Sequence, residues 1–301
     1  MTAAPRRTTV LSPDGTRINV ETHGPEDAPA IVLSHGWTCS THFWRPVVEH
    51  LGADHRVICY DQRGHGASSH PARHGYSVAA LADDLCAVLE AVLAPEERAV
   101  VGGHSMGAMT VMAAADRPRF ARRAAAVLLA STGSTALPGS SRVLPGAARF
   151  PRLGAAAHRL LLGSTLPLGP LTPLTRAALH YVTMAPDADP AMVDYCVRIV
   201  HGCARLPRGR WGRVLAHLEL DRGLAHLEMP SVVLAGTRDR LTPIAQARHI
   251  RDLLPNCERF IEVAGAGHMT PLEAPETVAG ALADLAAAHL RTPVAHREET
   301  A

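Results

Sequence analysis

Residues Val100 to Met109 read VVGGHSMGAM, and this stretch decides how the whole chain is interpreted. A short apolar run ends at Gly103, and an alanine-rich run begins at Met106. Ser105 stands between them with a glycine two residues away on either side, which is the G-x-S-x-G pattern of a nucleophile elbow. Side chains at the glycine positions would collide in so sharp a turn, and the turn pushes the serine hydroxyl out above the sheet. The pattern predicts Ser105 as a nucleophile at a strand-to-helix turn.

Short apolar runs alternate with longer amphipathic runs around this turn, which is typical of a parallel sheet covered by helices on both faces. The runs that predict strands are AIVLS (30–34), RVICY (56–60), AVVGG (99–103), AAAVLLA (124–130), SVVLAG (231–236) and RFIEVAG (259–265). Helices are expected over 43–51, 77–93, 106–118, 191–206, 243–254 and 274–290. TTVLSP and RINVET around Asp14-Gly15 predict an initial hairpin. Asp83 and Asp84 are expected on the solvated face of the helix that begins at Ser77.

The alternation stops between Ser131 and about Leu215, where Pro, Gly and Arg are frequent. We interpret this interval as a helical insertion on the sheet. The predicted organisation is an α/β core made of residues 1–133 and 216–301, with a helical cap of residues 134–215. Sites in such sheets lie at the carboxyl ends of the strands, so the functional residues are expected there.

A serine hydroxyl needs a base to remove its proton, and the base needs an acid to orient it. His268 follows the last predicted strand, and Asp239 follows the strand before it, so both are expected at the carboxyl edge. The order Ser, Asp, His is the one this sheet topology requires. The alternative for Asp239 is a helix cap. We interpret His104 as structural and His65 as a loop residue that forms hydrogen bonds.

The tetrahedral intermediate of acyl transfer also needs hydrogen-bond donors for its oxyanion. The backbone N–H of Met106 is one candidate because it directly follows the serine at a helix start. The other is the N–H of Trp37, in the Ser34-His35-Gly36-Trp37 loop after the first buried strand, where Gly36 allows the backbone to turn inward.

Composition excludes several classes of function. The sequence of 301 residues has a net charge of +2, which gives no field that would imply nucleic acid. It contains no Lys, which excludes Schiff-base chemistry and a Walker-type phosphate loop. The six cysteines are scattered and are expected to be free thiols. No signal peptide or membrane span is expected, so the predicted location is cytoplasmic, and the expected mechanism needs no metal and no organic cofactor.

The motifs together resemble the α/β-hydrolase superfamily, in its serine-nucleophile group with an H-G-x oxyanion loop. The resemblance rests on SHGW (34–37), DQRGHGAS (61–68), GHSMG (103–107), GTRDRLTP (236–243) and GAGHMTPLEAPE (265–276). It implies the α/β-hydrolase fold, a mostly parallel doubly wound sheet with an inserted cap. It also implies the roles assigned above to Ser105, His268, Asp239, Trp37 and Met106. Asp61 and Arg63 in the second motif are expected to be scaffold.

The leading interpretation is a serine hydrolase that cleaves a carboxylic ester, thioester or lactone through an acyl-enzyme. The same triad could serve C–C bond hydrolysis, cofactor-free haloperoxidase or perhydrolase chemistry, or acyl transfer, because the cap selects the substrate. A non-catalytic ligand receptor is a third alternative. Relatives that use an Asp at the elbow are excluded by Ser105.

The expected partner is a small-molecule substrate, and a homodimer stays open. LLLGSTLPLGPLTPL (160–174) suggests an apolar wall and hence an apolar acyl or alkyl group in the substrate. The interval from Ser131 to Leu215 holds ten arginines against three aspartates, a net charge of +7. Such a cap could attract an acidic substrate or the phosphate of a carrier arm, or it could be an ordinary solvated surface.

Overall fold

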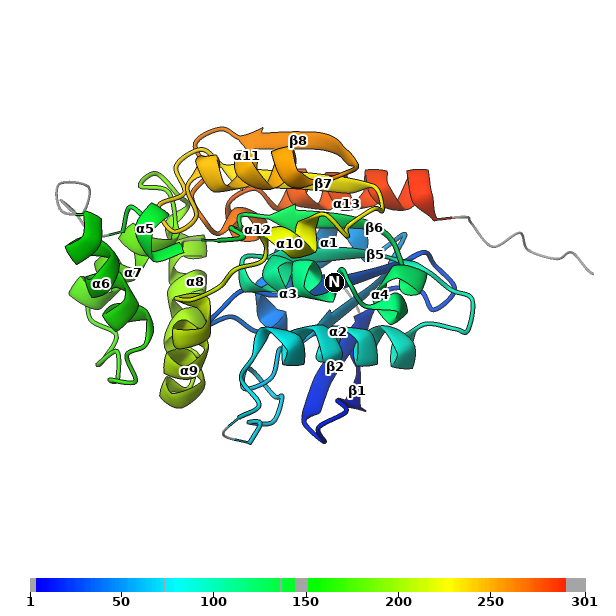
Figure 1. Cartoon of the computed structure of the whole chain (residues 1–301), viewed down its shortest axis with the longest axis horizontal. Helices are drawn as coiled ribbons and strands as arrows, with labels where there is room; N and C mark the ends of the chain where they lie inside the picture. The colour runs from blue at the N-terminus through cyan, green and yellow to red at the C-terminus, as the bar shows by residue number, and fades with distance from the viewer. Residues whose placement is uncertain (1–3, 73, 136, 144–150, 291–301) are drawn as a thin grey trace, which may run out of the picture.

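The computed structural model describes residues 4–72, 74–135, 137–143 and 151–290. An eight-stranded sheet forms the centre, with strand order β1-β2-β4-β3-β5-β6-β7-β8 (Figure 1). The first two strands pair antiparallel, and β2 also pairs antiparallel with β4, while the other neighbours are parallel. The strands are β1 Arg6–Leu11, β2 Arg17–His23, β3 Ala30–Ser34, β4 Arg56–Tyr60, β5 Ala99–His104, β6 Ala124–Ala130, β7 Ser231–Gly236 and β8 Cys257–Val263.

Helices cover both faces of the sheet, and each face has its own apolar core. One core includes side chains of α2 (Val78–Val92), α3 (Met106–Ala114) and α11 (Ile244–Leu253), with the short α4 (Pro118–Arg123) and α10 (Asp221–Leu224) beside them. The other core includes side chains of η1 (Thr41–Trp44), α1 (Arg45–Leu51), α12 (Thr270–Glu273) and α13 (Pro275–His289). Strands β3, β5, β6 and β7 are buried along their whole length, which explains their continuous apolar sequence.

The predicted strands and the initial hairpin are confirmed, and β6 and β7 have the predicted bounds. The helix expected over 106–118 is shorter than predicted: α3 ends at Ala114, and Pro118 begins α4. Proline is compatible with the first turn of a helix, where its missing N–H leaves no hydrogen bond unmade. Ser77 caps α2 by accepting a hydrogen bond from the N–H of Ala80, as expected.

The interpretation of Asp84 as a solvated residue is wrong. Its carboxylate is 1% exposed and accepts two hydrogen bonds from Arg63, at 2.6 Å from Nε and 2.5 Å from Nη2. Arg63 also donates to Asp14, Ser12 and the carbonyl of Gly75, so it ties four segments together. Asp83 is partly exposed beside Arg117, as predicted. The scaffold role expected of Arg63 is therefore visible in its contacts.

Between β6 and β7 the chain forms a set of helices instead of more sheet. Before α10, the described residues of this interval form α5 (Leu137–Ser140), α6 (Pro151–Leu162), α7 (Pro173–Thr183), α8 (Pro190–Gly202) and α9 (Arg205–Leu215). Figure 1 shows them gathered at one end of the sheet. Five leucines of the stretch 160–174 are 48–80% exposed, so its expected role as an apolar wall remains a prediction. Of the ten arginines counted in this interval, Arg149 lies outside the described residues.

Candidate active site

Ser105 lies at the turn between β5 and α3 with φ 52° and ψ −116°, a positive φ that side-chain-bearing residues rarely adopt. The glycines around it have no room for a side chain. A Cβ on Gly103 would lie 2.4 Å from the backbone nitrogen of Ala108, and one on Gly107 would lie 1.9 Å from the carbonyl oxygen of Ser34. The backbone therefore has the geometry expected of a nucleophile elbow, seated against the loop that follows β3.

Asp239 and His268 are in direct contact. Asp239 follows β7, His268 follows β8, and the distance from His268 Nδ1 to Asp239 Oδ2 is 2.8 Å. The second carboxylate oxygen of Asp239 accepts the N–H groups of Leu241 and Thr242, and the Thr242 hydroxyl donates to Oδ2. Both residues are buried, at 4% exposure each. Because the carboxylate is an acceptor, it holds the proton of the imidazole on Nδ1 and leaves Nε2 as the basic nitrogen.

The elbow and the His268 loop touch through His104. The distance from His104 Nε2 to the carbonyl oxygen of His268 is 2.9 Å, and the two imidazole rings have centroids 4.9 Å apart. Burial lowers the pKa of His104 well below its usual value, so its ring is neutral and donates from Nε2 to that carbonyl. Among the described residues no hydrogen bond joins the Ser105 hydroxyl to His268. The structural role expected of His104 thus includes support of the loop that carries His268.

Two of the backbone N–H groups that have no acceptor among the described residues lie in the loop of residues 34–37 and at the start of α3. They are those of Trp37 and Met106, the pair expected to bind an oxyanion. Gly36 brings the first loop against the elbow, because a Cβ there would lie 3.3 Å from Cβ of Ser105 and 2.8 Å from Nδ1 of His104. Trp37 also donates from its indole Nε1 to the carbonyl of Arg208 in α9 at 3.0 Å.

Sequence reasoning missed Glu273. Its Oε2 accepts the N–H groups of Ala185 (2.8 Å) and Gly267 (2.9 Å), and its Oε1 accepts that of Met269 (3.0 Å). It therefore holds both neighbours of His268 and ties them to the connection between α7 and α8. Burial raises the pKa of the carboxyl group, whereas the three N–H donors oppose that shift. Glu273 lies inside the GAGHMTPLEAPE motif, but that motif pointed to His268 and assigned Glu273 no role.

A second missed contact joins the same connection to the His268 loop. The carbonyl of Thr183 accepts the N–H groups of both His268 (3.1 Å) and Met269 (3.2 Å). Gly267 makes this approach possible, since a Cβ there would lie 2.5 Å from the backbone nitrogen of Ala185. The turn after β6 also supports the site: Thr132 donates to the carbonyl of Ser105 at 3.0 Å.

His35, in the loop that follows β3, and His65 both form hydrogen bonds, as expected for His65. His65 Nε2 accepts the N–H of Thr38, and His35 Nε2 accepts the N–H of Gln62. Burial lowers the pKa of His35 to about 4 and that of His65 to about 3. Both rings are therefore neutral at pH 7, and neither supplies a positive charge to the site.

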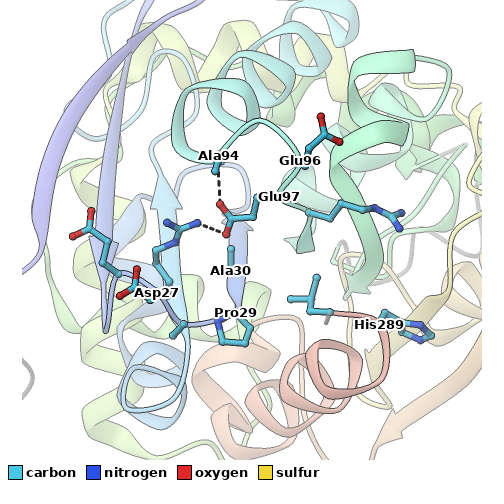
Figure 2. Close-up of a pocket in the computed structure, with 12 residues that line it drawn as sticks. Asp27, Pro29, Ala30, Ala94, Glu96, Glu97 and His289 are labelled. Carbon is cyan, nitrogen blue, oxygen red and sulfur yellow. Dashed lines mark hydrogen bonds and ion pairs between the residues drawn. The ribbon is translucent and has the colours of Figure 1, made fainter. Parts of the chain in front are cut away.

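A cavity of about 830 Å³ lies away from these residues (Figure 2). Its lining includes Ala30 and Arg56, the first residues of β3 and β4, so it is at the amino ends of the strands. Arg56 is paired with Glu97, whose carboxylate also accepts the N–H of Ala94 at 2.9 Å. None of its described lining residues is a serine or a cysteine. The nucleophile, acid and base candidates all lie at the opposite, carboxyl ends.

Two features are absent from the described part of the chain. No group of three or more His, Cys, Asp or Glu side chains there could hold a metal ion. No helix there has the length and apolar character needed to cross a membrane. The six cysteines are free, four of them buried.

Comparison with known proteins places this architecture in a family. A family model of the alpha/beta hydrolase fold matches residues 29–275. The chain belongs to the alpha/beta hydrolase fold family. This alpha/beta hydrolase is 31% identical over 254 residues to the provisionally named carbamate hydrolase RutD of Variovorax paradoxus, covering 83% of this chain and 90% of that protein. It is 25% identical over 276 residues to 3-oxoadipate enol-lactonase 1 of Acinetobacter baylyi, covering 89% and 92%.

A solved structure gives the same fold assignment for the alpha/beta hydrolase. An esterase from Exiguobacterium antarcticum superposes with a TM-score of 0.75 at 18% identity, covering 93% of this chain and 99% of that one. At that identity the likeness concerns the fold. Family membership makes the chain an enzyme of the α/β-hydrolase type, and the individual reaction has to be argued from the site.

Proposed function

We propose that the protein is a serine hydrolase that cleaves a carboxylic ester, thioester or lactone. Ser105 attacks the carbonyl, His268 accepts the serine proton and then delivers it to the leaving group, and Asp239 stabilises the imidazolium. Water then releases the acyl group by the reverse proton transfers. The observation that carries this proposal is the 2.8 Å contact of His268 with Asp239 in a loop that is hydrogen-bonded to the Ser105 elbow.

The backbone supports the same reaction. We propose that the N–H groups of Trp37 and Met106 bind the oxyanion of the tetrahedral intermediate, because neither has another acceptor among the described residues. Loss of one such donor typically costs ~3 kcal/mol of transition-state stabilisation. The helix start at Met106 adds a partial positive charge beside the same atom. The lactonase among the relatives is consistent with a carbonyl substrate.

We propose residues 134–215 as a cap that selects the substrate, with residues 1–133 and 216–301 as the hydrolase core. The contacts of Thr183 with His268 and of Arg208 with Trp37 place segments of this interval against two site loops. A small-molecule substrate with an apolar acyl or alkyl part fits the apolar composition of the cap. Acyl transfer and perhydrolysis differ from hydrolysis in the acceptor of the acyl group, whereas C–C bond hydrolysis differs in the bond that is cleaved. Assays with added nucleophiles, with peroxide and with diketones therefore separate them from ester hydrolysis.

The test is Ser105→Ala with p-nitrophenyl butyrate, followed by a panel of lactones and thioesters. We expect the variant to lose at least 10³-fold in kcat/KM while keeping its fold by circular dichroism. A fluorophosphonate probe should label the wild type at Ser105 and leave the variant unlabelled. Unchanged turnover by the variant, or labelling at another serine, would refute the assignment.

A further inference from the structure

Large apolar side chains are exposed mainly on one part of the molecule. Among the described residues ten large hydrophobic side chains are exposed, and eight of them lie between Leu153 and Leu206. Seven of the eight are on α6, on α7 or in the connection between these helices. We call these seven the outer cap surface: Leu153, Leu160, Leu161, Leu166, Leu171, Leu174 and Tyr181. Figure 1 shows α6 and α7 together at the end of the molecule that is farthest from α13.

Helix α6 exposes an apolar face and an arginine edge. Leu153 and Leu160 are seven residues apart, so they share one face, and they are 69% and 79% exposed. Arg152 and Arg159 precede them by one residue each and are also exposed, so they line one edge of that face. The opposite side is buried at Leu162. A surface helix normally turns mainly polar side chains to water, whereas this helix exposes leucines beside its arginines.

Helix α7 also exposes an apolar face, whereas its arginine, Arg176, is paired with Asp194 of α8. Leu174 and Tyr181 are again seven residues apart, and they are 80% and 41% exposed. Ala177 and Ala178, between them in the sequence, are exposed as well. The guanidinium of Arg240 lies 4.5 Å from the centre of the Tyr181 ring, which adds a positive charge at this end of the surface.

The segment that carries the outer cap surface contains no negative charge. The sequence has no Asp or Glu between Arg117 and Pro186, although the whole protein is close to neutral at +2. A second copy of the chain on a twofold axis would therefore bring arginines against arginines, with no carboxylate from this segment to pair them. An anionic partner with an apolar interior would satisfy both the leucines and the arginines.

We propose that the outer cap surface docks on an anionic phospholipid membrane surface. The leucines of α6 and α7 enter the boundary between headgroups and acyl chains, as amphipathic helices do when they lie in the membrane plane. Arg152 and Arg159 remain at the level of the phosphates, because their long side chains can reach outward from an inserted helix. Such docking involves no helix that spans the bilayer, and it does not depend on the proposed ester chemistry.

The test is flotation of the full-length protein with vesicles of phosphatidylcholine, with or without phosphatidylglycerol. We expect binding to the phosphatidylglycerol vesicles that weakens with salt. The variant R152Q/R159Q should lose about fivefold in affinity for each arginine replaced. The variant L153S/L160S/L174S should lose roughly tenfold or more, because each leucine contributes apolar area to the contact.

The matched control is L11S/L253S, which replaces exposed leucines outside the outer cap surface and should bind as the wild type does. Circular dichroism checks that every variant is folded. Failure of the wild type to float, or equal flotation of the triple leucine variant, would overturn the proposal. If light scattering showed a wild-type dimer that the triple variant loses, and no vesicle bound, the surface would be a self-association interface and the proposal would be wrong.

Discussion

Glu273 affects the proposed base, His268, through the backbone on both sides of it. Its two oxygens accept the N–H groups of Gly267, Met269 and Ala185, and its charge lies near the His268 ring. A carboxylate accepts at both oxygens, whereas an amide has one acceptor and one donor. Replacement by glutamine therefore sets an NH₂ group against a backbone N–H group and also removes the negative charge.

We expect E273Q to lower kcat/KM on the order of 10²-fold, the cost of misplacing a reacting group by about 1 Å. Loss of the nearby negative charge destabilises the imidazolium, so the acid limb of the kcat/KM profile should move to lower pH. The dependence of kcat/KM on pH, measured with p-nitrophenyl butyrate, tests both effects. E276Q, on exposed Glu276, is the control and should change neither. An unchanged acid limb in E273Q would contradict the electrostatic role.

The adjacent carboxylates Asp83 and Asp84 should differ sharply in what they contribute to stability. D84N leaves the buried Arg63 guanidinium with the partly exposed Asp14 as its remaining carboxylate partner. It should therefore cost roughly 3 kcal/mol of unfolding free energy, the lower end for a broken buried ion pair. Asp83 and Arg117 are partly exposed at 3.3 Å, so D83N should cost about 1 kcal/mol or less. Urea unfolding of the two variants measures the difference. Equal losses would show that the Arg63 cluster does not stabilise the fold.

At the scale of elements, the connection between α7 and α8 and the loop after β8 form one hydrogen-bonded unit. Thr183 and Glu273 provide the hydrogen-bond acceptors. Gly267, which has no side chain, lets the two segments approach each other. A methyl group at position 267 would lie 2.5 Å and 2.6 Å from backbone atoms of Ala185 and Met184, so the two segments would have to separate. The unit is therefore sensitive to a single added carbon.

We expect G267A to lower kcat/KM by about tenfold or more, because separation of the segments displaces the His268 loop. The matched control is G280A, inside α13, where an added Cβ meets nothing within 4 Å. That variant should keep its activity and gain roughly 0.5–1 kcal/mol, the usual advantage of alanine over glycine in a helix. Ester turnover and thermal unfolding of both variants decide the point. Full activity in G267A would show that the two segments are not coupled.

The element bounds that the sequence predicted well are those fixed by local signals. Apolar runs such as AAAVLLA gave β6 its bounds because every residue of that strand is buried. The range 106–118 places Pro118 at the end of one helix, whereas it begins the next, because proline is compatible with the first turn of a helix. Asp84 was missed because its partner, Arg63, comes from another segment, and helical periodicity cannot show such a partner. Glu273 was missed because its partners are backbone N–H groups, which side-chain patterns in a sequence do not show.

The site was predictable to the extent that its residues follow strands. The positions of Ser105, Asp239 and His268 after three parallel strands were sufficient to expect them at one edge, and the Asp239–His268 contact has the expected partners. Their catalytic roles stay predictions, as do those of Trp37 and Met106. The exposure of the leucines in 160–174 could not be predicted, because apolar composition alone does not tell a buried side chain from an exposed one.

At the scale of the whole molecule, three buried histidines make stability depend on pH. Burial lowers the pKa of His35 to about 4, that of His65 to about 3, and that of His104 well below its usual value. The unfolded chain therefore binds more protons than the folded chain below about pH 6.5, so the free energy of unfolding falls as pH falls. Each histidine contributes about 1.4 kcal/mol per pH unit between its folded and unfolded pKa values.

We expect urea unfolding to show this loss between pH 7 and pH 5. H65N keeps an amide donor and acceptor near Arg63 and Thr38 but cannot be protonated, so it should remove about one third of the slope that the three histidines contribute. The slope of unfolding free energy against pH for wild type and variant is the measurement. A variant slope equal to that of the wild type would mean that His65 is protonated equally in both states.

The docking of residues 183–185 against the His268 loop bears on the timing of turnover. If product leaves by outward movement of this connection, the movement takes the Thr183 carbonyl away from the N–H groups of His268 and Met269. It also breaks the hydrogen bond from the N–H of Ala185 to Glu273. In the open enzyme the proposed base, His268, would then be displaced from Ser105. A carbonyl compound that bound before closure would not be attacked. Reactivity and closure would thus be a single event in this protein.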